Sequence, residues 1–438
     1  MRLPLLAISA ALLTACGGGS STPAPAPATY SVGGSISGLE ASGLVLANGS
    51  ATVRAMPGDT RFAFAPNVTS GTPYSMSIAT QPLGFQLCNF SGPVSGAVAG
   101  ADVTLALICA NALGLVSTVA GTDGTIGGWV DPYTSSAFSN PYHIAVDAAG
   151  TLYVADNGNS SIRKISGGVV TTLAGGKRGA ADGIGINAQF GSPVGVALDD
   201  AGNLFVTDGN NLNIRKIAPN GTVTTVAGNG DYGHANGSAS TASFTSPSGI
   251  AVDKAGNLYV ADFYDNRIRK ITPAGQVSTF AGSGSMGVVD GQGEAASFSY
   301  PAGLCIDDKG NLYVTDSAGN RVRKITPSGA VTTLAGTGVF GGKADGPVAT
   351  ATFSQPVGIA VDNAGFIYVA DMGNNVVRKL SPSGQVSTLA GGGLSYKTDG
   401  LGSIASFASV KGIAVDNRGN LFVGDGTRVR KLTPAVGQ

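Results

Sequence analysis

Histidine and glutamate are scarce in this 438-residue chain, which has only two of each. The histidines are His143 and His234, too few for a zinc site built from several imidazoles. Lysine plus arginine and aspartate plus glutamate both number 26, so the basic excess typical of phosphate-binding proteins is missing. We therefore expect no nucleic-acid partner.

Charged residues of any kind are also few. They make up 12% of the chain, whereas 43% of residues are hydrophobic, which excludes a charged disordered chain. Glycine contributes 68 residues, and a sequence rich in glycine and poor in glutamate disfavours helices. The composition therefore predicts a folded protein that is not α-helical.

The first 28 residues have the composition of a targeting segment. Residues 1–15 contain one arginine, a short apolar run and small residues, as in a signal peptide too short to span a bilayer. Leu13, Thr14 and Ala15 before Cys16 resemble the bacterial lipobox. This resemblance implies cleavage and lipidation at Cys16; the alternative is an ordinary signal peptide with a chance cysteine.

Residues 16–28 continue as a tether of glycine, serine, proline and alanine, which cannot build a core. Gly17 follows the cysteine, and in Gram-negative lipoproteins a residue other than aspartate there favours the outer membrane. We therefore expect a lipid-anchored protein of the cell envelope, held at the outer membrane of a Gram-negative bacterium.

Residues 29–111 predict a small β-sandwich module. They contain short strand-like runs separated by glycine, proline, asparagine and serine. Cys88 and Cys109 both lie in this module, 21 residues apart, so we expect a disulfide between them. Cys305 stands where other repeats have alanine, which favours a small buried residue over a nucleophile.

A unit of four short strands recurs six times in residues 112–438. In each unit an aspartate ends the second strand, and successive aspartates are 52, 54, 54, 55 and 54 residues apart. They are Asp156, Asp208, Asp262, Asp316, Asp371 and Asp425. Four strands in a period of about 50 residues are typical of a β-propeller blade.

The ends of the repeat region predict a closed ring. It begins at residues 116–121 with a strand that matches the fourth strand of the unit. It ends at residues 428–432 with a strand that matches the third strand of the unit. The first strand can therefore complete the last blade, which removes an open sheet edge. We expect an all-β protein with a six-bladed propeller of four-stranded blades, closed by its N-terminal strand.

Residues 247–271 carry the repeat most clearly, from Pro247 through Asp253 and Asp262 to Ile271. This pattern resembles the NHL-repeat family over about residues 115–434. The resemblance implies a propeller. It does not fix the function, because members include peptide-amidating lyases, receptor sensor domains, protein-interaction platforms and RNA binders.

The recurring polar residues have a structural interpretation. Asp253 followed by Gly256 is typical of a tight turn. The second aspartate stands seven residues before an arginine, as in Asp316 and Arg323, which favours an ion-pair or capping network. A carboxylate ring that binds Ca²⁺ is the alternative. We expect the lysine after each arginine to be solvated.

Departures from the repeat mark the candidate ligand site. Long loops that follow the fourth strands emerge on one face of a propeller and usually carry function. Some residues on this face depart from the repeat, and others place an aromatic ring or an imidazole there. They are Trp129, Tyr133, Tyr142, His143, Tyr232, His234, Phe263, Tyr264, Tyr300, Tyr396 and Lys411. Such residues suit a protein partner, a glycan or a small molecule, although aromatics can also cover the ends of blades.

We identify no catalytic residue and no metal ligand, and we expect no cofactor. The amidating-lyase relatives use several metal-bound histidines, and no nucleophile elbow stands out. The sequence favours a monomeric, lipid-anchored envelope protein that binds a ligand or partner. The alternatives are a cation-dependent hydrolase or lyase, with Ca²⁺ as the candidate ion, and a structural scaffold.

Overall fold

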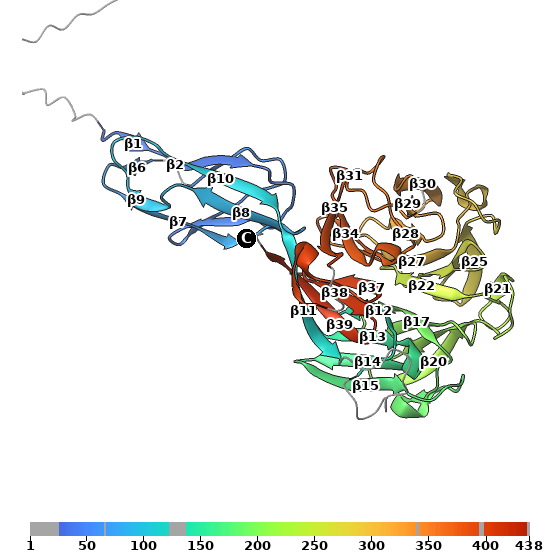
Figure 1. The fold of residues 1–438 in the computed structure, drawn as a ribbon. Helices are drawn as coiled ribbons and strands as arrows, with labels where there is room; N and C mark the ends of the chain where they lie inside the picture. The colour runs from blue at the N-terminus through green and yellow to red at the C-terminus, as the bar shows by residue number, and fades with distance from the viewer. Residues whose placement is uncertain (1–25, 65–66, 122–136, 339–340, 394–397, 436–438) are drawn as a thin grey trace, which may run out of the picture.

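The computed structural model describes residues 26–64, 67–121, 137–338, 341–393 and 398–435. Within these ranges the protein consists of β-strands and five 3₁₀ turns, without an α-helix and without a helix able to cross a membrane. Figure 1 shows a small module of blue strands beside a larger ring of sheets. The expectation of an all-β propeller is confirmed.

Two four-stranded sheets form the N-terminal module. One contains β5 (Arg61–Ala63), β2 (Val32–Ser37), β10 (Val103–Asn111) and β8 (Gln86–Ser91). The other contains β4 (Ala51–Arg54), β3 (Val45–Asn48), β7 (Pro73–Thr80) and β9 (Ser95–Ala97). A short pair, β1 (Thr29–Tyr30) with β6 (Val68–Thr69), lies beside them.

The two module sheets share one apolar core. Val32 and Leu107 from the first sheet pack with Leu46 and Met76 from the second, and all four are buried. Cys88 in β8 lies directly opposite Cys109 in β10, and their sulfur atoms are bonded. The predicted disulfide is confirmed, and it joins two neighbouring strands under this core.

Six further antiparallel sheets follow within the described residues; their strands are given from the inside of the ring outward. The first sheet has β12 (Pro141–Val146), β13 (Leu152–Asp156), β14 (Ser161–Ser166) and β15 (Val169–Gly175). The second has β17 (Pro193–Leu198), β18 (Leu204–Asp208), β19 (Asn213–Ile217) and β20 (Thr222–Ala227). The third has β22 (Pro247–Val252), β23 (Leu258–Asp262), β24 (Arg267–Ile271) and β25 (Gln276–Ala281).

The remaining sheets repeat this order. The fourth has β27 (Pro301–Ile306), β28 (Leu312–Asp316), β29 (Arg321–Ile325) and β30 (Ala330–Ala335). The fifth has β32 (Pro356–Val361), β33 (Ile367–Asp371), β34 (Val376–Leu380) and β35 (Gln385–Gly391). The sixth has β37 (Val410–Val415), β38 (Leu421–Asp425), β39 (Arg428–Ala435) and β11 (Leu113–Gly121).

Two-residue strands and short turns decorate these sheets. The outer edges of the second to sixth sheets carry β16 (Gly183–Ile184), β21 (Gly237–Ser238), β26 (Gly291–Gln292), β31 (Gly346–Pro347) and β36 (Gly400–Leu401). The 3₁₀ turns are η1 (Asn157–Asn159), η2 (Gly185–Asn187), η3 (Gly293–Ala295), η4 (Met372–Asn374) and η5 (Gly402–Ile404).

The innermost strands close the ring. β12, β17, β22, β27, β32 and β37 contact one another in this order, and β37 contacts β12 again. The N-terminal strand β11 pairs antiparallel with β39, so that Val116 lies opposite Leu432 (Figure 1). The strand made first in the propeller thus completes its last sheet, as the repeat pattern predicted.

Glycine permits the close approach of neighbouring inner strands. A Cβ atom on Gly412 would come within 2.0 Å of the carbonyl oxygen of Tyr142 on the next sheet. The same close contact occurs at Gly195, Gly249, Gly303 and Gly358. The first sheet carries His143 at this position instead.

A buried arginine ties each sheet to the loop before it. In the fourth sheet Arg323 Nη1 lies 2.9 Å from Asp316 Oδ2, and Nη2 lies 2.7 Å from Asp290 Oδ1. The guanidinium also covers the ring of Phe298, 5.2 Å from its centroid. Asp316 in turn accepts a hydrogen bond from the backbone N–H of Ser299 at 2.6 Å. The ion-pair interpretation of the repeat is therefore confirmed.

The N-terminal module packs directly on the propeller. Phe85 is fully buried, and its ring meets that of Tyr368 edge-on with centroids 5.9 Å apart. Lys379 Nζ donates hydrogen bonds to the carbonyl oxygen of Gly84 at 2.9 Å and to Asn111 Oδ1 at 2.8 Å. The expectation that the repeat lysines are solvated is wrong at Lys379, because the module covers it. Burial lowers its pKa to about 8.

Candidate functional site

Three of the predicted ligand-binding residues meet where the first and sixth sheets adjoin. Tyr142 and His143 lie near the start of β12, and Lys411 lies near the start of β37. The Lys411 ammonium is 5.0 Å from the centroid of the Tyr142 ring, and it donates a hydrogen bond to Asn140 Oδ1. Burial raises the pKa of Tyr142 and lowers the pKa of Lys411. The cluster therefore presents a phenol and an ammonium at the strand starts that surround the ring's opening.

His143 adds a polar atom without a partner. Its ring lies 5.6 Å from the ring of Tyr142, and the residue is 9% exposed. Within the described residues its buried Nε2 has no hydrogen-bond partner. Burial lowers the pKa of His143 to about 4, so the imidazole is neutral at pH 7. A neutral ring nitrogen can donate or accept a hydrogen bond, but burial keeps this Nε2 out of reach of solvent.

A second cluster joins the third and fourth sheets. The rings of Phe263 and Tyr300 stack with centroids 5.0 Å apart and planes 16° apart. Tyr264 stands edge-on to both rings and is 59% exposed. Tyr300 has φ +58°, an unusual conformation for a bulky residue, and its N–H donates to Asn266 Oδ1 at 3.0 Å. The strained backbone holds the Tyr300 ring in the stack.

The two clusters share the same opening. The Tyr264 phenol is close enough to Tyr142 to help raise its pKa, as the second cause after burial. Residues from three different sheets thus converge: Tyr142 from the first, Tyr264 from the third and Tyr300 from the fourth. The arrangement is an aromatic rim with polar atoms beside it, which suits a ligand that has a ring and hydroxyl groups.

Asp265 directly follows Tyr264 of the second cluster, and the sequence interpretation did not single it out. The residue is 7% exposed; one carboxylate oxygen pairs with Arg267 and lies 3.8 Å from His234 Nδ1. The other oxygen is buried and has no hydrogen-bond partner in the described ranges. Burial raises the pKa of Asp265. The available signal was an aspartate three residues after Asp262, where three of the other repeats have asparagine.

Asparagine at that position has a structural role in three of the other sheets. Asn159, Asn211 and Asn374 each donate a hydrogen bond to the ring aspartate three residues before them. A carboxylate cannot donate such a bond. In the third sheet two carboxylates therefore lie near each other, and Asp265 contributes to the raised pKa of Asp262. This local exception distinguishes the third sheet chemically.

The remaining predicted residues have different outcomes. Tyr232 is 72% exposed and forms a backbone bridge to Phe244, and none of the described contacts joins it to either cluster. Trp129, Tyr133, Tyr396 and Cys16 lie outside the described residues. Cys305 is partly buried, and burial raises the pKa of its thiol. In the described ranges no three histidine, cysteine, aspartate or glutamate side chains gather as a metal site would require.

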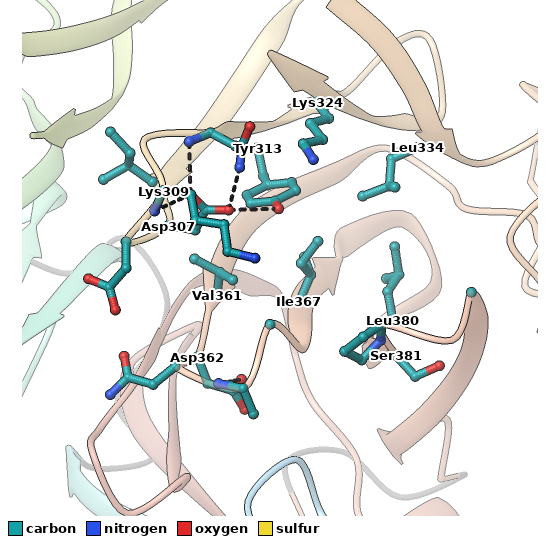
Figure 2. A pocket seen from close by; sticks show the side chains of 18 of the residues that line it. Asp307, Lys309, Tyr313, Lys324, Leu334, Val361, Asp362, Ile367, Leu380 and Ser381 are labelled. Carbon is teal, nitrogen blue, oxygen red and sulfur yellow. Dashed lines mark hydrogen bonds between the residues drawn. The ribbon is translucent and has the colours of Figure 1, made fainter. Parts of the chain in front are cut away.

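A hollow opens at the other ends of the strands. It lies between the fourth and fifth sheets, has a volume of about 550 Å³, and is drawn in Figure 2. Its lining includes Asp307 and Asp362, which end the first strands of these sheets, and the turn residue Ser381. The sequence interpretation placed all candidate function on the opposite face and did not anticipate this cleft.

We expect His143→Gly to change how stability depends on pH. In the wild type the folded pKa of about 4 lies below the ordinary value of 6.5, so acid protonates the unfolded chain first. The contribution of His143 to folding is therefore lost as the pH falls from 6.5 toward 4. The wild type should lose about 3 kcal/mol relative to the variant between pH 8 and pH 4. Urea unfolding across this range measures the difference.

The matched control is His234→Ala, which removes the other, exposed imidazole. It should retain the pH profile of the wild type. Parallel profiles for the wild type and His143→Gly would show that His143 can be protonated in the folded protein, contrary to its burial.

The geometry defines a class of protein: a β-propeller built from a repeat, with a polar aromatic rim at one opening. Residues 190–217, 244–271, 298–325 and 353–380 each match the NHL repeat. The chain is therefore an NHL-repeat β-propeller protein.

Curated relatives share this repeat region only. The chain is 30% identical over 281 residues to the Arabidopsis thaliana protein SUPPRESSOR OF QUENCHING 1, chloroplastic, covering 59% of this chain and 26% of that protein. It is 28% identical over 288 residues to human NHL repeat-containing protein 2, covering 57% and 40%. The chain thus spans less than half the length of either relative.

Solved structures share the fold more completely. A protein of unknown function from Bacteroides thetaiotaomicron has 18% identity and a TM-score of 0.56, with 89% of this chain and 90% of that chain covered. An auxiliary nutrient binding protein from the same organism has 15% identity and a TM-score of 0.55, covering 92% and 97%. At these identities the likeness shows the fold alone.

Proposed function

We propose that this protein is a lipid-anchored binding protein of the cell envelope whose propeller takes a glycan at the aromatic rim. The observation that carries the proposal is the exposed Tyr264 ring held by the Phe263–Tyr300 stack. An exposed aromatic ring that its neighbours fix in place gives a sugar a rigid surface at little entropic cost.

The polar atoms beside the rim support a neutral, polyhydroxylated ligand. Lys411 supplies donors, and the hydroxyl groups of Tyr142 and Tyr264 can both donate and accept. Sugar hydroxyls can also donate and accept, so they match this mixture. A strongly cationic ligand would meet the like charge of the Lys411 ammonium.

Tyr264→Ala should weaken glycan binding at least tenfold, because the variant loses the exposed stacking surface. The probe is a panel of neutral envelope-type oligosaccharides presented to immobilised protein, with affinities measured by surface plasmon resonance. Tyr232→Ala is the matched control, since Tyr232 is also exposed but lies outside the aromatic stack. Equal affinity for Tyr264→Ala and wild type would contradict the proposal, as would failure of the whole panel to bind.

The anchor is a separate part of the proposal. It is supported by the lipobox-like sequence at Cys16 and by the segment rich in glycine, serine, proline and alanine that follows. Cys16→Ser should move the protein from the membrane fraction to the soluble periplasmic fraction and abolish incorporation of labelled palmitate, because the lipidated thiol is gone. An unchanged membrane fraction for this variant would contradict a lipid anchor at Cys16.

A further inference from the structure

The cleft between the fourth and fifth sheets is a feature that the proposed ligand site leaves unexplained. Figure 2 shows apolar side chains from both sheets facing it, with Tyr313 and Lys324 along its wall. We call it the 4/5 cleft and define it by Tyr313, Lys324, Leu334, Val348, Val361, Ile367 and Leu380. The Tyr313 hydroxyl donates to Asp307 Oδ2 at 3.0 Å, so that wall is already fixed.

The equivalent cleft one sheet further along is filled by the N-terminal module. Tyr313, Lys324 and Leu334 stand 55 residues before Tyr368, Lys379 and Leu389 in the repeat. The second set, with Leu421 and Leu432 of the sixth sheet, forms one buried core around Phe85. The module thus inserts an aromatic ring where the 4/5 cleft is hollow.

The lysines of the two clefts differ in their hydrogen-bond partners. Lys379 donates to the Gly84 carbonyl and to Asn111, both from the module. Lys324 lies along the wall of the 4/5 cleft, 5.9 Å from the Tyr313 ring centroid. No hydrogen bond to its ammonium is found within the described residues. The 4/5 cleft therefore has the lysine donor but lacks the carbonyl acceptor that the module supplies in the neighbouring cleft.

The cleft between the third and fourth sheets is filled by a side chain of the third sheet itself. In the third sheet Phe280 takes the place of Leu334, and its ring packs edge-on against Tyr259 with centroids 5.0 Å apart. Lys270 covers both rings, at 5.5 and 6.0 Å from their centroids. An aromatic ring beside the tyrosine and lysine is thus present in both neighbouring clefts, once from the sheet itself and once from the module.

We propose that the 4/5 cleft docks a loop of a partner protein that carries one aromatic side chain next to a free backbone carbonyl, as Gly84 and Phe85 do. The ring would fill the space beside Leu334, and the carbonyl would accept from Lys324. The cleft adjoins the module interface, because Ala364 lines it and also packs against the Phe85 core. This proposal does not depend on the glycan site at the opposite strand ends.

A photoreactive copy of the module loop tests the proposal on the full chain. The probe is acetyl-Pro-Leu-Gly-X-Gln-amide, in which X is p-benzoylphenylalanine at the position of Phe85. Irradiation and mass spectrometry should place adducts on 4/5 cleft residues. Leu334→Phe should reduce these adducts at least tenfold, because its ring fills the space as Phe280 does in the third sheet. Lys324→Met should reduce them several-fold.

The control is Leu173→Phe, the same change at the equivalent position of the first sheet, which should leave the adducts unchanged. Adducts that persist in Leu334→Phe, or that fall on Tyr368 and Leu389 instead, would overturn the proposal. Sedimentation distinguishes a second occupant. Self-association of the wild type that Leu334→Phe abolishes would show that another copy of this chain fills the cleft, which would also overturn it.

Discussion

Arg323→Met should lower the free energy of unfolding by about 3–5 kcal/mol. The substitution leaves the buried Asp316 carboxylate without its cation, and it removes hydrogen bonds to the carbonyls of Ser297 and Val289. Because methionine keeps much of the side-chain volume over the Phe298 ring, the lost free energy of unfolding comes mainly from the missing charge and its hydrogen bonds. Urea unfolding at pH 8 measures it.

The effect should shrink in acid. Burial raises the pKa of Asp316 to about 6 even with Arg323 present, and removal of the arginine raises it further. When the pKa of a carboxyl group is higher in the folded than in the unfolded protein, the fold becomes more stable as the pH falls. In the variant this gain begins at a higher pH than in the wild type. The destabilisation should therefore be smaller at pH 5 than at pH 8.

Lys216→Met is the control for this change. The lysine is next to an equivalent buried arginine, Arg215, but its own side chain is only partly buried and carries no ion pair among the described contacts. Its removal should cost less than about 1 kcal/mol. A similar loss for both variants would mean that the buried pairs contribute no more than a surface cation does.

Phe85→Ala should release the N-terminal module from the propeller. Truncation of a fully buried phenylalanine typically costs about 3–5 kcal/mol, and here the cavity would lie in the interface between the two bodies. We expect one thermal transition to separate into two and the connection near Ala112 to become sensitive to protease. Calorimetry and limited proteolysis measure these changes.

Phe90→Ala provides the comparison within the module. Phe90 packs against the module's own core and belongs to a different cluster from Phe85. This variant should weaken the module without exposing the connection under native conditions. If Phe85→Ala kept a single transition and full protease resistance, the interface would contribute little to holding the two bodies together.

The propeller could be predicted from the sequence because its signals recur. Six copies of one pattern place the strands, and the offset between the first and last strands closes the ring. The pairing of Arg323 with Asp316 was also readable, since both residues lie in one hairpin. Its second partner, Asp290, was not, because it comes from an irregular loop 33 residues away.

The candidate site was predictable only where it interrupts the repeat. Tyr142, His143 and Lys411 stand out against small residues and glycine at the same positions. Asp265 was missed because it differs from asparagine by one polar atom, and its importance depends on burial. The contact of Phe85 with Tyr368 has no periodic signal at all, because the module occurs once and docks on one sheet.

The pairing of β11 with β39 also determines when the ring can form. β11 is synthesised before any other propeller strand, and β39 is the last strand described. Until β39 emerges, β11 has an unpaired edge, and long-range pairing of this kind is slow and exposed to aggregation. The attached module, which is complete before the propeller, would keep this waiting strand next to a folded body during synthesis. The pairing of β11 with β39 thus determines both where the ring closes and at which stage of folding it can close.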